Sequence, residues 1–484
     1  MIATSNRESL RSRVRLRMTE AQHATVYQHL FPGDGYEAVA VLVCGRGGTP
    51  GDEVLLVHTV VPIPHDECAE RTPVRVTWST DRLRRLLEGA AKHAQALVKV
   101  HSHPGGWLDF SEWDDSSDRA LFPSIYGWLD SNRPHLSLIM MPTGLIRARA
   151  VSADGTFSEV ESVAAIGTAI RELIVAPSSA VGVVHDAHDH RAERHTVRTR
   201  QAFGDGTTDR LGRMSIGVVG CSGTGSWVVE LLARLGVGQL TLVDPDRVEH
   251  LNLNRIVHAT TADAETSRPK VEVMTRAVAS MGTGIHVDAY VEDVITPRMV
   301  RRLSRCDAII GCVDSIDARD VLGRISTYYI LPYVDVGVRL VADGHGGISH
   351  VVGSAQYVHP NSPSLLDRGL YTAKQLADAG LRRSDPAAYA EQVKAKYISN
   401  ADEDRPAVAS VNAFYASLAV NELLARLHSF RDDEPALGVT ISLSQLRIIL
   451  PDGGPPSPGL VKRTGRGDAS PLLGLPALSE SISS

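Results

Sequence analysis

The sequence contains few cysteines and no pair of them at metal-binding spacing. The five cysteines stand at positions 44, 68, 221, 306 and 312, and none of them forms a CxxC pair. An odd number without such pairs excludes a regular disulfide framework and a zinc site built from cysteine. It also favours a reducing compartment, so we expect a cytoplasmic protein.

Long apolar runs and a strong net charge are missing as well. No stretch approaches the roughly 20 apolar residues that cross a bilayer, so we expect no membrane partner. The formal net charge of −6 gives no electrostatic reason to expect nucleic acid as a partner. Several arginines occur in the first twenty residues, but no apolar stretch follows them. We therefore expect a flexible leader there, not a secretory signal.

What is present is enough for two α/β domains. The chain has 484 residues, of which 43% are hydrophobic and 22% charged, as is usual for a globular protein. A polar, histidine-containing stretch near the middle predicts a linker, and the Pro-, Gly- and Ser-rich end predicts a flexible tail. The predicted organisation is a leader over 1–20, a first domain over 21–175, a linker or arm over 176–205, a second domain over 206–450 and a tail over 451–484.

The most informative motif is His101-Ser102-His103-Pro104, which is followed by Ser111 and Asp114. Alternate residues of an extended segment face the same side, so the two histidines can bind one ion together. Ser111 is a suitable N-cap for a helix that carries Asp114 in its first turn. His101, His103 and Asp114 would supply three metal ligands and leave a fourth position for water, which is the geometry of catalytic zinc.

Hydrolysis at such a site also needs a general base and a hydrogen-bond donor for the oxyanion. Glu37 lies in an apolar setting that would raise its pKa, and we predict that it is the base. Ser111 is the predicted donor. The surrounding pattern predicts strands over 37–44, 53–58 and 96–100, and a helix over 81–93.

Glu37, the histidine pair, Ser111 and Asp114 together resemble the JAMM (MPN/JAB) metalloprotease motif. The resemblance covers roughly residues 20–170. It implies an MPN/JAB α/β domain with the activity of a zinc isopeptidase at the C-termini of ubiquitin-like proteins. A coincidental pair of core histidines is the alternative, and the match at all five positions argues against it.

A second motif begins where a strand predicted over 214–220 runs into a helix predicted over 224–236. A glycine-rich turn at this point lets the backbone approach phosphates at a helix N-terminus. The turn residues are Gly220, Gly223, Gly225 and Ser226. Asp244 ends the next predicted strand, over 239–244, and is placed to bind ribose hydroxyls. On these features alone an NAD-dependent oxidoreductase stays open, because a glycine-rich turn is a weak motif.

The residues that follow favour ATP over a nicotinamide cofactor. Arg255 and Lys270 can neutralise a triphosphate, and Asp314 can hold magnesium. The pattern resembles the ThiF-like family, which includes ubiquitin-activating enzymes and activators of molybdopterin and thiamine sulfur carriers. The resemblance spans roughly residues 190–450 and implies a Rossmann-like, doubly wound domain that adenylates a carrier C-terminus.

The resemblance also assigns roles to individual residues. It implies that Asp244 binds the ribose, that Asn252 and Arg255 contact the phosphates and that Lys270 bridges them. Asp314 would position magnesium, with Asp246 assisting nearby. In that family an arginine ahead of the first strand reaches the ATP site of a partner subunit. Arg198 or Arg200 is the predicted equivalent, with a surface arginine as the alternative, so we expect a homodimer through this domain.

The sequence departs from the family in its cysteines. Many ThiF-like proteins carry paired zinc cysteines or a thioester cysteine after the magnesium aspartate, whereas this sequence has none after Cys312. We hypothesise that Ser364 or Ser362 accepts the acyl group as an oxyester, with a solvated loop serine as the alternative. Otherwise the adenylate passes to the thiol of a partner, such as a conjugating-enzyme-like protein, or to a sulfur donor.

Together the two motifs predict a bifunctional enzyme of a prokaryotic ubiquitin-like pathway, with Zn²⁺ at the first site and ATP with Mg²⁺ at the second. The peptidase would expose or remove a carrier, and the second domain would activate its C-terminal carboxylate. Two alternatives stay open: activation of a sulfur carrier for biosynthesis, and a non-catalytic scaffold that binds a carrier. The identity of the carrier and the biological process, defence or biosynthesis, also stay open.

Overall fold

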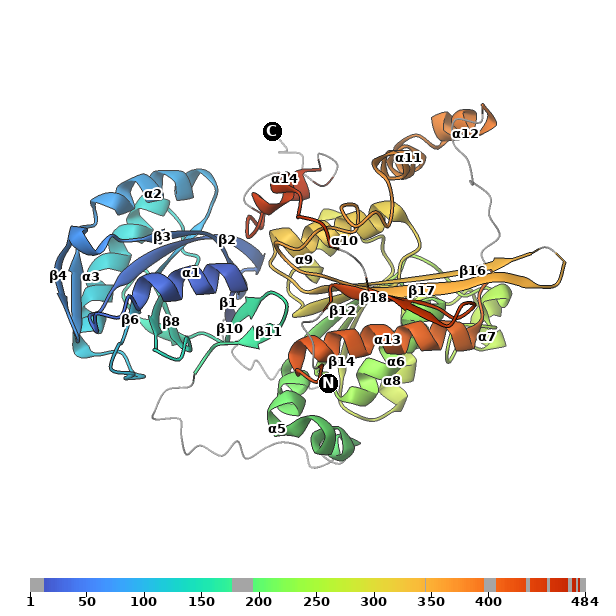
Figure 1. The fold of residues 1–484 in the computed structure, drawn as a ribbon, viewed down its shortest axis with the longest axis horizontal. Helices are drawn as coiled ribbons and strands as arrows, with labels where there is room; N and C mark the ends of the chain where they lie inside the picture. The colour runs from blue at the N-terminus through green and yellow to red at the C-terminus, as the bar shows by residue number, and fades with distance from the viewer. Residues whose placement is uncertain are drawn as a thin grey trace, which may run out of the picture. The chain divides into compact units, whose positions relative to one another are not determined.

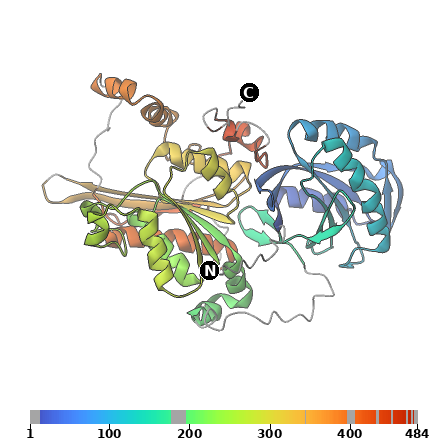
Figure 2. The same ribbon diagram turned by 180° about the vertical axis from the view of Figure 1, so that it is seen from behind.

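Strands and helices alternate along the computed structural model, which describes residues 13–175, 195–343, 345–395, 406–431, 436–450, 453–468, 472–475 and 478. The chain divides into two units, each of mixed α/β structure as the sequence predicted. The first unit contains Met1–Val184, Tyr328–Ile330 and Arg463–Ser484. The second contains His185–Thr327 and Leu331–Lys462. In each unit, helices cover both faces of a central sheet (Figures 1 and 2).

The first unit is built on a nine-stranded mixed sheet in the order β11-β10-β1-β3-β2-β6-β7-β8-β9. Its strands are β1 (Arg13–Thr19), β2 (Val39–Thr49), β3 (Asp52–Pro62), β6 (Ala96–Ser102), β7 (His135–Met140), β8 (Ile146–Val151), β9 (Phe157–Glu159), β10 (Ser162–Ile166) and β11 (Ile170–Glu172). β4 (Cys68–Thr72) and β5 (Arg75–Trp78) form a separate hairpin, which follows the short 3₁₀ helix η1 (His65–Glu67).

Two hydrophobic cores lie on the two faces of this sheet. Because side chains alternate along a strand, β2 sends Ala40 and Leu42 into one core and Val39 and Val41 into the other. Helix α1 (Glu20–Leu30) packs on the first face, and α2 (Asp81–Lys92) and α3 (Glu112–Leu129) pack on the second. The sheet and α3 thus hold the predicted metal ligands on rigid elements.

Residues 13–19 form strand β1, so the expectation of a flexible leader is wrong for this segment. It pairs in parallel with both β10 and β3, and its apolar residues Val14, Leu16 and Met18 are buried in the core. Arg15, which suggested a solvated segment, is buried too, and its guanidinium donates to Asp52 at 2.7 Å. Pairing with strands distant in sequence orders this segment, and composition alone does not reveal such pairing.

The second unit contains an eight-stranded sheet in the order β14-β13-β12-β15-β16-β17-β18-β19. The strands are β12 (Ser215–Val219), β13 (Gln239–Val243), β14 (His286–Tyr290), β15 (Ala308–Gly311), β16 (Tyr333–Ala342), β17 (Ile348–Val358), β18 (Gly438–Ser442) and β19 (Arg447–Ile449). The strands from β14 to β16 pair in parallel, and the last three are antiparallel. The chain reverses direction across the sheet at β12 and β15, and ligands bind at such a switch point in open α/β sheets.

Helices cover both faces of the second sheet, with α6, α8 and α13 on one face and α9 and α10 on the other (Figure 1). They are α5 (Val197–Arg213), α6 (Gly223–Leu235), α7 (Thr261–Glu265), α8 (Lys270–Ser280), α9 (Pro297–Leu303), α10 (Ile316–Tyr328), α11 (Ala373–Ser384), α12 (Pro386–Lys394) and α13 (Ala409–Leu427), with the 3₁₀ helix η3 (His250–Asn252). α11 and α12 are two separate helices, because Pro386 cannot continue a helix and Asp385 caps a new one. In the described part of the chain, no helix combines the length and apolar character needed to span a membrane.

The end of the chain differs from the expected flexible tail. After α14 (Pro458–Val461), residues from Arg463 onward belong to the first unit. There Gly467 forms a parallel bridge with Arg46 of β2, and the Thr464 carbonyl lies 2.7 Å from Nδ1 of His58. Leu472 and Leu473, in the 3₁₀ helix η4 (Leu472–Gly474), are buried. The described residues 463–468, 472–475 and 478 are ordered by packing on a domain that lies far from them in sequence.

Candidate active sites

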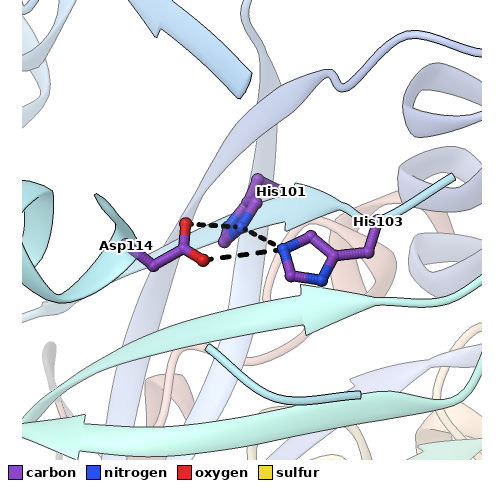
Figure 3. A group of neighbouring side chains, drawn as sticks. All are labelled: His101, His103 and Asp114. Atoms are coloured by element: carbon purple, nitrogen blue, oxygen red, sulfur yellow. Dashed lines mark hydrogen bonds and ion pairs between the residues drawn. The ribbon is translucent and has the colours of Figure 1, made fainter. Parts of the chain in front are cut away.

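The predicted metal ligands come together in the first unit at the end of β6. His101 is the next-to-last residue of β6 and His103 follows the end of this strand, while Asp114 lies in the first turn of α3. Nε2 of His101 lies 3.1 Å from Nε2 of His103 and 3.0 Å from Oδ1 of Asp114. Oδ2 of Asp114 lies 3.6 Å from Nε2 of His103. Figure 3 shows the two rings and the carboxylate facing one another.

This donor set fits a divalent cation. Nδ1 of His103 lies 2.9 Å from the Trp107 carbonyl, so it carries the ring proton and leaves Nε2 free to bind a metal. The three residues are buried, and one potential ligand atom from each lies within 4.8 Å of the others. Two imidazole nitrogens and a carboxylate are the ligands of an open, catalytic zinc site.

The protonation of these groups also favours a cation. Burial lowers the pKa of His101, which keeps its imidazole neutral. Burial opposes the ionisation of Asp114, but hydrogen bonds with His101 and His103 outweigh it and hold the pKa of Asp114 well below its usual range. Burial likewise opposes the charging of His103, yet its bonds to Asp114 and to the Trp107 carbonyl raise its pKa. The ionised carboxylate of Asp114 and the neutral imidazole of His101 are the forms that bind a cation.

Glu37 stands beside this group, as the sequence predicted. Oε1 of Glu37 lies 3.9 Å from Nε2 of His103. Burial raises the pKa of Glu37 to about 7, against the opposing charge of His103. A carboxyl group with a pKa near neutrality can take and return a proton, which is the property of a general base. Glu37 precedes β2 instead of lying within the strand expected over 37–44.

Ser111 is the N-cap of α3, in a capping box with Asp114. Its hydroxyl donates to Oδ2 of Asp114 at 2.7 Å, and the Asp114 amide lies 3.2 Å from the Ser111 oxygen. In this arrangement Ser111 orients the Asp114 carboxylate. A bond from this hydroxyl to an oxyanion would require it to leave Asp114.

The second site is a cavity of about 780 Å³ in the second unit. It lies at the carboxyl ends of β12, β13 and β15, where the switch point of the sheet predicts a ligand. Its size suits a nucleotide, since ligand pockets commonly measure about 300–1,000 Å³. The predicted residues among its lining are Gly220, Gly223, Asp244, Asp246, Asn252, Arg255, Lys270 and Asp314.

The glycine turn between β12 and α6 tolerates no side chain at two positions. Gly220 has a φ of 87°, and a Cβ there would lie 2.6 Å from the Cys312 carbonyl oxygen. A Cβ on Gly225 would lie 1.7 Å from the Gly220 carbonyl oxygen. The missing side chains let the turn close tightly and leave backbone amides at the start of α6 for an anion.

Asp244 connects the loop after β12 to the loop after β13 by hydrogen bonds. Its carboxylate accepts the backbone N–H of Cys221 at 2.6 Å and that of Asp246 at 2.8 Å. Burial raises the pKa of Asp244 despite the nearby Lys270. Lys270 in turn donates to Oδ2 of Asp246 at 2.7 Å. Lys270, which is predicted to neutralise phosphate, is thus bound to Asp246, which is predicted to assist near the magnesium ion.

Asn252 and Arg255 line the same cavity from the segment after β13. Asn252 is buried, and its side-chain oxygen accepts the N–H of Glu249 at 3.2 Å. Arg255 donates to the Leu251 carbonyl at 2.8 Å and to Oδ1 of Asn254 at 3.1 Å. These bonds orient a cationic group and an amide along one wall of the cavity.

The sequence prediction gave no role to several polar residues of the lining, among them Arg319, Arg383 and Asn412. Arg319 of α10 follows Asp314 by five residues, and no spacing rule singles it out. Asn412 lies against the glycine turn, because a Cβ on Gly223 would come within 2.4 Å of its Nδ2. Tertiary packing brings α13 to the cavity.

Other predicted residues lie outside the lining of the cavity. Ser226 is buried behind the turn, where it donates to the Gly223 carbonyl at 3.2 Å and accepts the Val257 amide. Ser364 donates to Oδ2 of Asp367 at 2.9 Å and caps a turn. Arg198 and Arg200 of α5 bond to side chains of their own helix. Except for His195, the histidines between 185 and 195 lie outside the described residues.

Comparison with known proteins finds two families along the chain. Residues 194–449 match the ThiF family, and residues 19–150 match the prokaryotic homologs of the JAB domain. Similar curated proteins include the tRNA threonylcarbamoyladenosine dehydratase of Escherichia coli K12, 30% identical over 29% of this chain and 52% of that protein. The SAMP-activating enzyme E1 of Haloferax volcanii is 27% identical over 36% of this chain and 59% of that protein.

A third relative is the adenylyltransferase and sulfurtransferase MOCS3 of Arabidopsis thaliana, 37% identical over 22% of this chain and 23% of that protein. The matched regions cover less than two thirds of each of these three relatives. Among solved structures, MccB of E. coli is similar with a TM-score of 0.42 and 18% identity, over 57% of this chain and 73% of that one.

Proposed function

Because the chain belongs to the ThiF family and also contains a domain homologous to the prokaryotic JAB domain, we propose that it is an enzyme with two active sites. The first unit hydrolyses an amide bond at the C-terminus of a ubiquitin-like or sulfur-carrier protein. The second unit adenylates the C-terminal carboxylate of the same carrier. The product of the first reaction is the substrate of the second, and a shared chain raises its effective concentration.

The convergence of His101, His103 and Asp114 beside Glu37 carries the peptidase half of the proposal. His101, His103 and Asp114 would hold a zinc ion, which would supply Lewis acidity and lower the pKa of the attacking water. Glu37 removes a proton from that water and delivers it to the leaving amine, as the cleaved bond requires. Ser111 keeps the Asp114 carboxylate in place during the reaction.

Cleavage of a fusion protein tests this half. The probe is a small ubiquitin-like protein that ends in Gly-Gly and is fused to a reporter, incubated with the zinc-loaded chain. Glu37→Gln should lower the cleavage rate by about 10²- to 10⁴-fold, because the proton transfer is lost. Glu88→Gln removes an exposed acid of α2 and should cleave at the wild-type rate. Cleavage that survives both Glu37→Gln and a chelator would rule out the zinc mechanism.

The cavity at the carboxyl ends of β12 and β15 carries the adenylation half. The carrier carboxylate oxygen bonds to the α-phosphorus of ATP, and the bond from that phosphorus to the bridging oxygen of pyrophosphate breaks. Lys270 and Arg255 bind and orient the phosphates, and their charge offsets the charge on the leaving pyrophosphate. Asp314 would hold the magnesium ion, which supplies further positive charge. The relatives described as an activating enzyme and as an adenylyltransferase support this activity.

Exchange of labelled pyrophosphate into ATP measures this reaction, with the Gly-Gly carrier as acceptor. Asp314→Asn should reduce the exchange by about 100-fold, the scale expected when one electrostatic contact to a transition state is removed. Glu272→Gln, an exposed acid of α8, is the matched control and should exchange normally. Equal exchange by the wild type and Asp314→Asn would contradict the adenylation proposal.

The acyl group then leaves for an acceptor outside the cavity. Cys312 lines the cavity, but burial raises its pKa, so its thiol stays protonated and a poor nucleophile. Ser364 is bonded to Asp367 and does not line the cavity. We therefore favour transfer from the adenylate to a partner: a thiol of a conjugating-enzyme-like protein, or a sulfur donor if the carrier is a sulfur carrier. A homodimer through the second unit remains part of the proposal, with Arg198 or Arg200 reaching the neighbouring subunit.

A further inference from the structure

The hairpin of β4 and β5 holds the backbone of Glu37. The Glu37 N–H donates to the Thr72 carbonyl at 2.8 Å, and the Glu37 carbonyl accepts Nε of Arg71 at 2.9 Å. Both main-chain hydrogen-bonding groups of Glu37 are thus satisfied by two consecutive residues of β4. The hairpin belongs to neither large sheet, so these bonds connect the residue to an otherwise separate element.

Arg71 also binds the loop that leads to Glu37. Its guanidinium donates to both carboxylate oxygens of Asp34, at 2.9 and 3.4 Å, and to the Tyr36 carbonyl at 3.4 Å. The Arg71 side chain is 11% exposed. A planar guanidinium directed at a carboxylate and two carbonyls fixes orientation better than a flexible ammonium. The Arg71 side chain therefore binds three acceptor groups of this loop: the Asp34 carboxylate and the carbonyls of Tyr36 and Glu37.

On its other side Glu37 is joined to the metal ligands through the backbone. Ala38 donates its N–H to Oγ of Ser102 at 2.9 Å, and Ser102 donates its N–H to the Ala38 carbonyl at 3.0 Å. Ser102 stands between His101 and His103. The position of Glu37 relative to the histidines is therefore set from two sides, by Ser102 and by Arg71.

The same hairpin contacts the helix that carries the third metal ligand. The guanidinium carbon of Arg75 in β5 lies 3.7 Å from the ring centroid of Trp113, the neighbour of Asp114. Val76 and Trp78 of β5 pack against the core beneath α2 and α3. The hairpin is thus anchored to the body of the unit and can serve as a fixed support for Arg71.

We propose that Arg71 is the positioning residue for Glu37 in the peptidase reaction. It holds the carboxylate at the distance from the metal ligands at which it can take the proton of the attacking water. Among the described residues Arg71 makes no bond to His101, His103 or Asp114, so it acts on the base and not on the metal. The inference rests on the proposed peptidase function.

The test compares Arg71→Gln with the wild type in the full chain. Arg71→Gln removes the charge and the bonds to Asp34, Tyr36 and Glu37, and Arg71→Lys restores a cation with fewer directed donors. Arg82→Gln is the matched control, because Arg82 forms an exposed ion pair with Glu67 just before the hairpin. Three quantities are measured: amide hydrogen exchange of the peptide covering 33–38, Co²⁺ affinity from its visible spectrum, and kcat and KM for the fusion protein.

We expect at least tenfold faster exchange over residues 33–38 in Arg71→Gln, with unchanged Co²⁺ affinity, and kcat at least tenfold lower at a similar KM. Arg71→Lys should recover part of kcat, and Arg82→Gln should match the wild type in all three. Unchanged exchange would overturn the proposal, and so would a loss of Co²⁺ affinity parallel to kcat. If the wild type neither binds Co²⁺ nor cleaves, the peptidase function fails, while the exchange still decides whether Arg71 holds the loop.

Discussion

At the scale of single residues, the protein buries several ionisable groups beside a specific partner. Asp118 is fully buried between Lys99 and Arg149, and Glu422 is fully buried beside Arg426. His135 is buried as well, and the Leu97 N–H donates to its Nδ1 at 2.9 Å. An acceptor at Nδ1 requires the neutral imidazole, so the fold stabilises one protonation state of this ring.

His135 should make the stability of the first unit sensitive to acid. Burial and the charge of Arg46 lower its pKa from 6.5 to about 3. As the pH falls, His135 therefore binds a proton in the unfolded chain before it does so in the folded chain. Its contribution to the free energy of unfolding is complete above pH 6.5 and is lost as the pH falls toward 3. The free energy of unfolding should decrease by up to ~1.4 kcal/mol per pH unit from this group.

Urea unfolding at several pH values between 7 and 5 measures this slope. His135→Gln should have a shallower slope than the wild type, because its amide does not titrate. His93→Gln, an exposed histidine after α2, should keep the wild-type slope. Identical slopes for His135→Gln and the wild type would show that the ring does not carry the effect.

At the scale of elements, the predicted metal ligands come from β6, from the residue that follows it and from α3, and a buried ion pair joins the strand to the helix. Lys99 of β6 bonds to Asp118 of α3, and Arg149 of β8 bonds to the same carboxylate at 2.6 Å. Lys99 stands two residues before His101, and Asp118 stands one turn after Asp114. The pair therefore fixes the spacing between the histidines and the carboxylate ligand.

Asp118→Ala should destabilise the first unit by about 3–5 kcal/mol, because it leaves two buried cations without their carboxylate. Co²⁺ affinity should fall with it, since β6 and α3 lose their connection. Urea unfolding and titration with Co²⁺ measure the two effects. Glu112→Ala, on the exposed side of α3, should change the unfolding free energy by no more than about 0.5 kcal/mol. A loss of stability below about 1 kcal/mol in Asp118→Ala would mean that the pair is solvated.

At the scale of the whole molecule, the first unit is assembled from segments far apart in the sequence. β1 occupies a central place in its sheet, between β10 and β3. The segment from Arg463 belongs to the same unit, although most of the second unit lies between this segment and Val184 in the sequence. The first unit therefore depends on residues at both ends of the chain.

Deletion of residues 463–484 should destabilise the first unit without affecting the second. The cut removes the buried leucines 472, 473 and 478, and a buried leucine contributes about 1.5–3 kcal/mol. We expect a loss of at least about 3 kcal/mol in the unfolding of the first unit, measured by calorimetry. ATP binding by the second unit should stay at the wild-type level. An unchanged transition of the first unit would show that the segment only rests on its surface.

The spacing of residues in the sequence predicted the histidine pair with Asp114 and the glycine turn, because short motifs fix which atoms a strand end or a turn presents. His101, His103, Asp114 and Glu37 meet as predicted, and eight predicted residues line the nucleotide cavity. Such motifs act locally, through the alternation of a strand and the first turn of a helix.

Only the tertiary structure decided what depends on contacts between distant segments. It ordered residues 13–19 and 463–468, whose composition suggested flexibility, because burial against remote strands compensates for the loss of chain entropy. It brought Asn412 and Arg319 to the cavity and supplied Arg71 as a support for Glu37. No sequence spacing encodes these contacts, because each forms only when separate elements pack together.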